Sequence, residues 1–231
     1  MKMPKWLKSE TESDESFETE AEVSPMIEAA LIEGTEIATA MGWRRVEALA
    51  PGDKVLTFDR GLCPVVEVIL HPSSTQAADE PTPMSMRPLH VPPGMVGNED
   101  SFEVMPGAHV MIESEVAEAL LGDPFLLIPA AALTSRNGVE QAPAFHRRPE
   151  LVSLVFEQDE VIFLRRGGMQ LCTAKRELQD LLDSDGHLGP TAALSLAEAR
   201  DFLAMSESDT VTVGPGRPAD EKRRAAGWRA A

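Results

Sequence analysis

Most residues that could do chemistry in this chain lack the spacing that a functional site requires. Metal ions are held in proteins by His, Cys, Asp or Glu side chains that converge from closely spaced positions. The histidines at His71, His90, His146 and His187 are scattered along the sequence, with no paired spacing among them. We therefore predict no metal site, and no motif of the chain indicates a cofactor.

Two short motifs have the residue types of other sites but not their context. Residues 165–168, Arg-Arg-Gly-Gly, lack the strand–GxxxxGK[ST]–helix arrangement of a phosphate-binding loop. We interpret them as a turn at the end of a strand. Asp159 and Glu160 supply adjacent carboxylates that could act as an acid–base pair. We predict instead that both lie in a solvated turn between two strands.

The two cysteines are Cys63 and Cys172, which lie far apart in the sequence. A disulfide framework or a four-ligand zinc site would need more cysteines at closer spacing. One disulfide between them and two independent reduced thiols both remain open, and the sequence favours the reduced thiols.

The stretch from 34 to 68, GTEIATAMGWRRVEALAPGDKVLTFDRGLCPVVEV, has the pattern of short strands separated by tight turns. Turn-forming residues occur at Gly42, at 51–53 (Pro-Gly-Asp) and at 59–61 (Asp-Arg-Gly). The last turn suits a hairpin, because its glycine can adopt a positive φ. Strands are predicted over 35–40, 43–49, 54–58 and 65–70, the last of these being the strand that returns along 54–58.

The rest of the chain alternates further short strands with three helices. Residues 71–88 are polar and contain prolines, so a long loop is predicted there. Strands are predicted over 89–91, 102–105, 109–112 and 125–128, and a late hairpin over 151–156 and 161–164. Helices are predicted over 113–121, near 175–183 and over 196–205. The last helix begins with a capping box, Ser195 followed by Glu198.

Length and composition indicate one domain with two tails. Of the 231 residues, 43% are hydrophobic, which is enough for a core. Residues 1–26 are acidic and poor in apolar residues, so we predict disorder there. The domain is predicted over 27–205, and the Gly-, Pro- and Arg-rich residues 206–231 are predicted to form a flexible tail.

Charge and hydropathy limit the partners of the chain. The net charge of −17 argues against general binding of nucleic acid, whose phosphates need a basic surface. No apolar stretch approaches the roughly 18 residues of a membrane span, and no signal peptide is recognisable. We therefore expect no membrane partner and, by default, a cytoplasmic location, with non-classical secretion left open as the alternative. The acidic segment 1–26 is a candidate docking element for a protein partner.

The block at 34–68 resembles the opening of the Hint domain, the self-cleaving module shared by hedgehog autoprocessing domains and inteins. The resemblance continues through VPPGMVGN at 91–98, HVMIES at 109–114, AEALLGDPFLLIPAAAL at 117–133 and DEVIFL-x-x-GG at 159–168. Over about 27–205 the chain is similar to Hint-type proteins of marine alphaproteobacteria. This resemblance implies a mainly β, horseshoe-like fold of two pseudo-twofold-related halves, with short helices added near the C-terminus.

The resemblance also implies where the family's nucleophile would lie. Hint domains place a Cys, less often a Ser, four residues before the glycine of a Gly-Thr pair, and its side chain attacks the preceding peptide bond. In this chain that position is Ala30, and a methyl group cannot attack a carbonyl. The nearest hydroxyls belong to Ser24 and Thr35, and Thr35 fits better as a structural residue of its turn. A terminal Asn of the kind that inteins cyclise is absent.

The second family motif, Thr-x-x-His, is matched in half. In Hint domains its histidine hydrogen-bonds to the amide nitrogen of the scissile bond and eases its departure. His109 takes the place of that histidine, but Pro106 takes the place of the hydroxyl residue. His109 is therefore either vestigial or still able to activate the bond.

Two functions follow as hypotheses. The favoured one is a degenerate Hint domain that has lost self-cleavage and is retained as a scaffold or binding module. The alternative is active autoprocessing, an N-to-O or N-to-S acyl shift carried out by a non-standard nucleophile. Under the first hypothesis the chain is not an enzyme, and under the alternative it is one.

Overall fold

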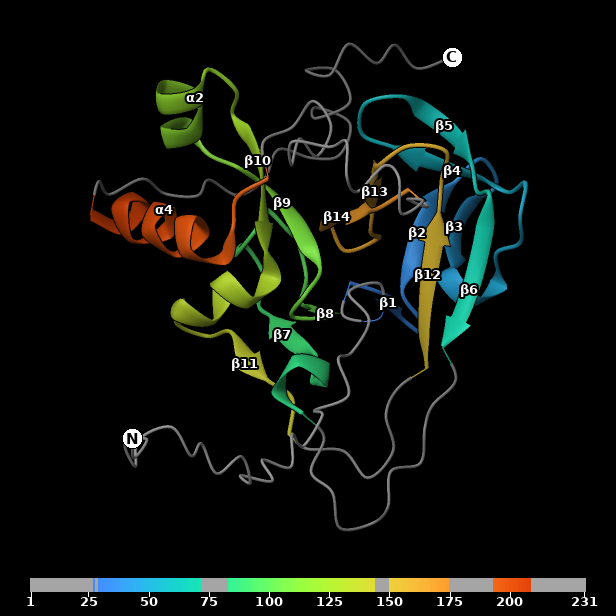
Figure 1. The fold of residues 1–231 in the computed structure, drawn as a ribbon, viewed down its shortest axis with the longest axis horizontal. Coiled ribbons are helices and arrows are strands. Elements are labelled where there is room, and N and C mark those ends of the chain that lie inside the picture. The colour runs from blue at the N-terminus through green and yellow to red at the C-terminus, as the bar shows by residue number, and fades with distance from the viewer. Residues whose placement is uncertain (1–26, 28, 72–82, 144–149, 175–192, 209–231) are drawn as a thin grey trace, which may run out of the picture.

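The computed structural model of the chain describes residues 27, 29–71, 83–143, 150–174 and 193–208. The predicted disordered segment 1–26, the predicted helix near 175–183 and most of the predicted tail lie outside these residues. Figure 1 shows two β-rich lobes, one carrying the helices on its outer side, with β13 and β14 between them. The prediction of a mainly β fold with short helices is confirmed.

The described residues form three antiparallel sheets, whose strands are as follows. The first sheet is β1 (Leu31–Ile32), β12 (Leu151–Val155) and β6 (Glu67–His71). The second is β10 (Phe125–Pro129), β9 (His109–Glu113), β14 (Met169–Cys172), β13 (Glu160–Phe163), β4 (Lys54–Thr57), β2 (Glu36–Thr39) and β3 (Gly42–Arg45), with β5 (Gly61–Pro64) beside β4. The third is β11 (Glu140–Gln141), β7 (Leu89–Val91) and β8 (Phe102–Val104).

The turn at 59–61 forms the predicted hairpin, but with a different returning strand. Gly61 has a φ of 76°, the left-handed conformation that glycine adopts without strain. The strand that returns along β4 is β5, not residues 65–70. The chain leaves the hairpin at Val65, whose N–H donates to the carbonyl of Asp53 at 2.9 Å. β6 then pairs with β12 in another sheet, so the prediction for 65–70 was wrong in its partner.

The predicted late hairpin over 151–156 and 161–164 is also wrong. β12 pairs with β1 and β6, whereas β13 pairs with β14 and β4. All five residues of β12 are buried, so the strand has no polar face to reveal its neighbours. The turn predicted at 165–168 is confirmed, because it joins β13 to β14 with Gly167 at a φ of 88°.

Glu160 does not lie in a solvated turn as predicted. It is the first residue of β13 and is 2% exposed. Its carboxylate accepts a hydrogen bond from Nε of Arg60 at 2.6 Å. Asp159 precedes the strand and accepts the backbone N–H of Ala174 at 2.7 Å. Both carboxylates therefore have a structural role: Glu160 binds the turn between β4 and β5, and Asp159 binds the backbone that follows β14.

The helices have the capping residues that their sequences indicate. Helix α2 (Glu115–Leu121) is capped at its N-terminus by Ser114, whose side chain accepts from the N–H of Ala117, and at its C-terminus by Gly122. Helix α4 (Leu196–Ser208) runs three residues beyond its predicted end. The predicted capping box is confirmed, since the Glu198 carboxylate accepts the Ser195 N–H at 2.8 Å and the Ser195 hydroxyl accepts the Glu198 N–H at 3.3 Å. Short 3₁₀ helices are η2 (Val46–Ala48), η3 (Met84–Met86) and η4 (Ala130–Ser135).

One large hydrophobic cluster joins the two lobes, and a smaller one lies on the other face of β9, β10, β13 and β14. Ala30, Val110, Cys172 and Phe202 belong to the large cluster, so β1 and helix α4 share one core.

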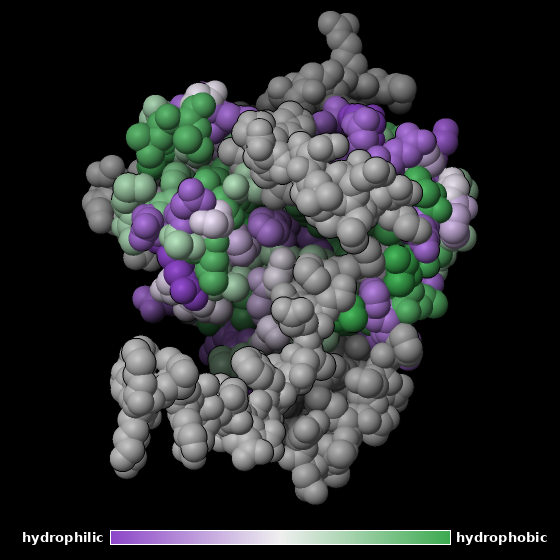
Figure 2. Space-filling view, in the orientation of Figure 1, coloured by the Kyte–Doolittle hydropathy of each residue, from purple (hydrophilic) through white to green (hydrophobic). Residues whose placement is uncertain are grey.

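Some large apolar side chains are exposed on the surface. Figure 2 shows hydrophobic surface over α2 and over the lobe of β4–β6, where Leu62, Val66 and Leu70 are 45–63% exposed.

Candidate functional site

Ala30 lies in the interior, immediately before the short strand β1. It is 3% exposed, and its N–H donates to the carbonyl of Ile27 at 3.2 Å. In the ladder between β1 and β12, Leu31 pairs with Val152 and Ile32 pairs with Leu151. The next position upstream therefore brings Ala30 opposite Ser153. Residues opposite each other in an antiparallel pair have Cβ atoms about 5 Å apart.

The peptide group before Ala30 is held by an amide side chain. Gln170, in the middle of β14, is 2% exposed and donates from Nε2 to the carbonyl oxygen of Ala29 at 2.9 Å. This N–H points at the oxygen that would carry negative charge if a nucleophile attacked that carbonyl. A donor of this kind stabilises a tetrahedral intermediate. Gln170 pairs with Val110 of β9, so the strand that begins at His109 runs beside this point.

A small cavity adjoins the same peptide group. Its volume is about 20 Å³, which is room for roughly one water molecule. Its walls come from three segments, and the lining residues are Ala29, Ala30, Leu31, Val152, Ser153, Leu154, Val155, Leu171, Cys172 and Thr173. Ser153, Cys172 and Thr173 are therefore the residues with a nucleophilic oxygen or sulfur that line the cavity beside Ala30.

Ser153 is hydrogen-bonded to a histidine. Its Oγ lies 2.9 Å from Nε2 of His71, the last residue of β6. Ser153 is 8% exposed and His71 is half-buried. Burial lowers the pKa of His71 from its usual value, because the charged imidazolium is poorly solvated there. The ring is therefore neutral at pH 7 and can accept the hydroxyl proton.

Cys172 is buried, and the structure shows both cysteines as free thiols. Burial, with a further contribution from the charge of Glu160, raises the pKa of Cys172 to about 12. A thiol with such a pKa is protonated at neutral pH and is a poor nucleophile. Cys172 therefore contributes packing to the cavity and is not equipped for attack at pH 7.

His109 lies at the start of β9, after the turn in which the Ala108 N–H donates to the carbonyl of Met105 at 3.0 Å. Pro106 takes part in the packing of this turn, since its carbonyl accepts the N–H of Ala131 at 2.9 Å. Burial lowers the pKa of His109, so its ring is neutral at pH 7. Within the described residues its side chain makes no hydrogen bond to Ala29 or Ala30.

Thr35 and Ala30 line different cavities. The backbone N–H of Thr35 donates to the carbonyl of Ile32 at 3.0 Å, and the neighbouring Gly34 N–H donates to the Glu47 carboxylate at 2.8 Å. Thr35 lines an open groove of about 380 Å³ between the lobes rather than the small cavity beside Ala30. The structure thus brings Ala30 together with Ser153 and Gln170, and it places Thr35 in the groove.

Comparison with known proteins identifies the family. A family model described as the Hint domain matches residues 29–179, which is more than half of the chain. The chain therefore belongs to the Hint family. No curated protein matches it.

Solved structures of similar fold are inteins and an intein-like domain. The bacterial intein-like domain from Clostridium thermocellum is 14% identical, with 62% of this chain and 97% of that one covered and a TM-score of 0.40. The gp41-1 intein is 14% identical, covers 63% and 98%, and has a TM-score of 0.35. A splice-inactive variant of the AceL NrdHF class 3 split intein is 14% identical, covers 64% and 99%, and has a TM-score of 0.32.

Among the described residues, no three His, Cys, Asp or Glu side chains gather as ligands for a metal ion. In the same part of the chain, no helix is long and apolar enough to cross a membrane.

Sequence reasoning missed Ser153, His71 and Gln170. Ser153 and Gln170 each interrupt an apolar strand, in LVSLV and MQLC, whose residues are all buried. A polar side chain is retained in such a strand when it has a partner. That interruption is the signal that could have singled out both residues. His71 gave no such signal, because its contact with Ser153 depends on the pairing of β6 with β12.

We expect acid to destabilise the domain through His71 and His109. Each has a folded-state pKa below its ordinary value, so the unfolded chain takes up protons first as the pH falls. Their contribution to stability is present above an unfolded pKa of about 6.5 and is lost as the pH falls toward the folded pKa. Urea unfolding at pH 7.5 and 5.5 measures the loss.

The variant His109→Gln should show a smaller loss between these pH values than the wild type. His90→Gln, on the exposed side of β7, is the matched control and should keep the wild-type difference. If His109→Gln lost as much stability between these pH values as the wild type, His109 would not be a source of the acid-induced destabilisation.

Proposed function

We propose that this chain is a Hint domain that has lost self-cleavage at position 30 and is retained as a scaffold or binding module. The observation that carries the proposal is the side chain at that position. Ala30 is buried beside the peptide bond that the family cleaves, and its methyl group has no atom that can attack. The thiol of Cys172 in the same cavity is protonated at neutral pH, which supports the same conclusion.

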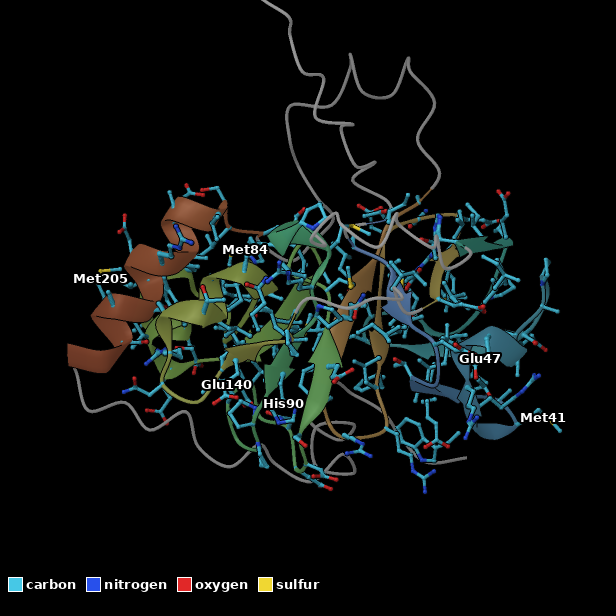
Figure 3. All side chains as sticks on the ribbon, turned by 90° about the horizontal axis from the view of Figure 1, so that it is seen from below. Met41, Glu47, Met84, His90, Glu140 and Met205 are labelled. Atoms are coloured by element: carbon cyan, nitrogen blue, oxygen red, sulfur yellow. The ribbon has the colours of Figure 1, made fainter. Side chains whose placement is uncertain are left out.

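The groove between the lobes is the surface best suited to binding. It measures about 380 Å³ and carries charged side chains of both signs, from Glu33, Glu36, Glu103, Arg165 and Arg166. Arg165 and Glu36 form an ion pair on one wall of it, with Nη1 of Arg165 at 2.7 and 2.8 Å from the two carboxylate oxygens of Glu36. Figure 3 shows His90 beside Glu140 on the paired strands β7 and β11. A groove of mixed charge and this size suits a polar segment of polypeptide.

The test is the intact mass of the purified chain. We expect one species of full mass after prolonged incubation at neutral pH, with or without a thiol such as dithiothreitol. Spontaneous release of residues 1–29, with or without thiol, would overturn the proposed loss of self-cleavage.

The alternative function, autoprocessing through a non-standard nucleophile, is supported by one specific observation. Gln170 still holds the carbonyl of Ala29 as a donor for charge that develops on its oxygen. If this alternative held, water or an added nucleophile such as dithiothreitol or hydroxylamine would cleave the ester or thioester that the acyl shift forms, and the fragment of residues 1–29 would appear. The intact-mass experiment therefore separates the two functions.

A protein partner of the acidic segment 1–26 is a further part of the proposal. The segment lies outside the described residues, and its charge supports the idea that it docks to a basic surface. A pull-down with the full chain should recover partners that a chain without residues 1–26 does not. Equal recovery by both chains would count against it.

A further inference from the structure

We propose that a pocket between helix α4 and the end of β9, which we call the α4 pocket, binds a small aliphatic carboxylate of the size of octanoate. The pocket has a volume of about 300 Å³. It shares no lining residue with the cavity beside Ala30 or with the groove between the lobes. The inference therefore goes beyond the scaffold role and is independent of whether the chain cleaves itself.

The walls of the α4 pocket are mainly apolar. They come from the segment after β7, the end of β9, and the helices η4 and α4, and Figure 1 shows α4 on the outer side of the lobe that holds β9. The volume is at the lower end of the range of about 300–1,000 Å³ that is usual for small-molecule sites. Six of the ten lining residues are apolar: Pro93, Met95, Ile112, Leu133, Phe202 and Leu203.

One wall carries a buried hydroxyl group whose proton has no acceptor. Ser114 is 7% exposed and lines the α4 pocket. Its Oγ accepts the N–H of Ala117 at 3.4 Å, and within the described residues no atom accepts the Ser114 hydroxyl proton in return. Buried polar groups of folded proteins are nearly always hydrogen-bonded. An unused donor beside a cavity therefore indicates that the cavity holds an acceptor.

Another wall fixes a positive charge at the same pocket. Nη2 of Arg136 donates to the carbonyl of Leu203 at 3.2 Å and to Oγ of Ser206 at 2.8 Å. Oγ of Ser206, which is 5% exposed, donates in turn to the carbonyl of Leu203 at 2.8 Å. These contacts hold the guanidinium against α4, and both acceptors of Nη2 are neutral. A guanidinium stays charged and has five N–H donors, so it can bind a carboxylate while it serves other acceptors.

The walls and the polar groups together select the class of ligand. The apolar residues favour a hydrocarbon body, because the burial of apolar surface is favourable. A pure hydrocarbon would leave the Ser114 hydroxyl unpaired, and a multiply charged group such as phosphate would be costly to bury among apolar side chains. One carboxylate has two oxygens, so it can accept from both Ser114 and Arg136. The ligand that fits is therefore an aliphatic monocarboxylate.

Isothermal titration calorimetry of the full chain at pH 7.5 tests the proposal, with octanoate as the probe and 1-octanol as its uncharged counterpart. We expect saturable binding of octanoate at one site. Its affinity should exceed that of 1-octanol by about tenfold or more, because hydrogen bonds to a charged group are the stronger ones. Butyrate has the same carboxylate and a shorter chain, and it should bind about tenfold or more weakly than octanoate.

Two variants remove the polar groups of the pocket. Arg136→Gln should lower the affinity for octanoate about tenfold and leave that for 1-octanol within about twofold, since the alcohol carries no charge. Ser114→Ala should also weaken the binding of octanoate, because it removes the second donor. Arg45→Gln changes an exposed arginine outside the pocket. It is the matched control and should bind octanoate as the wild type does.

Met95→Trp tests the pocket without altering its polar groups. The larger side chain would occupy the space of the ligand, so folded Met95→Trp should lose the binding of both octanoate and 1-octanol. This variant also decides the result if Arg136→Gln fails to fold, as judged by circular dichroism.

Three results would overturn the inference. They are the absence of saturable octanoate binding by the folded wild type, an affinity for octanoate no higher than that for 1-octanol, and wild-type octanoate binding by folded Arg136→Gln or Met95→Trp. None of these results changes the intact mass of the chain. The proposed loss of self-cleavage is therefore tested separately and would be unaffected.

Discussion

Replacing Ala30 with cysteine should produce a chain that releases residues 1–29 when a thiol is added, whereas the wild-type chain stays intact. The new thiol would attack the carbonyl of Ala29, to which it is linked through its own backbone nitrogen, and give a thioester. Gln170 already donates to the oxygen of that carbonyl at 2.9 Å. Intact mass with and without dithiothreitol measures the change from no detectable product to a defined fragment.

Two double variants show which groups assist that reaction. Ala30→Cys with Gln170→Leu should release the fragment about 10²–10³-fold more slowly, the cost of losing one oxyanion donor. Ala30→Cys with Pro106→Thr should react faster, because it restores the hydroxyl three residues before His109. If folded Ala30→Cys stays intact in thiol, the retained peptide geometry is not sufficient for the chemistry.

Local sequence patterns predicted the elements whose causes are local. The turn at 59–61 depends on Gly61, whose φ of 76° is a conformation that glycine adopts without strain. The capping box of α4 depends on Ser195 and Glu198, which are three residues apart. In both cases the residues that determine the structure are neighbours in the sequence. The family motifs then placed these elements in a Hint fold.

Strand partners could not be predicted, because they depend on contacts between distant residues. β12 is buried on both faces, and neither its composition nor its alternation distinguishes β6 and β1 from β13 as neighbours. For the same reason, part of the candidate site could not be predicted. Ala30 and His109 were found through their motifs, whereas Ser153 and His71 become a pair only after β6 is placed beside β12.

Removing Arg60 should destabilise the domain more than removing any exposed ion pair. The side chain of Glu160 is 1% exposed, and Arg60, from the turn between β4 and β5, is its charged partner. Arg60→Ala would leave a carboxylate inside the sheet next to Cys172 without that partner. Breaking a buried pair on one side costs about 3–5 kcal/mol, and we expect about 3 because Arg60 itself is 41% exposed. Urea unfolding measures the difference.

The double variant Arg60→Ala with Glu160→Leu decides the cause of that loss. If the cost comes from an uncompensated charge, an apolar residue at 160 should recover most of the stability, because it removes the charge and packs against the same strands. Arg165→Ala, which breaks the more exposed pair with Glu36, is the matched control and should cost less than about 1 kcal/mol. A double variant as unstable as Arg60→Ala would show that Arg60 acts through its own packing. The hairpin of β4 and β5 would then be held by the aliphatic part of that side chain rather than by its charge.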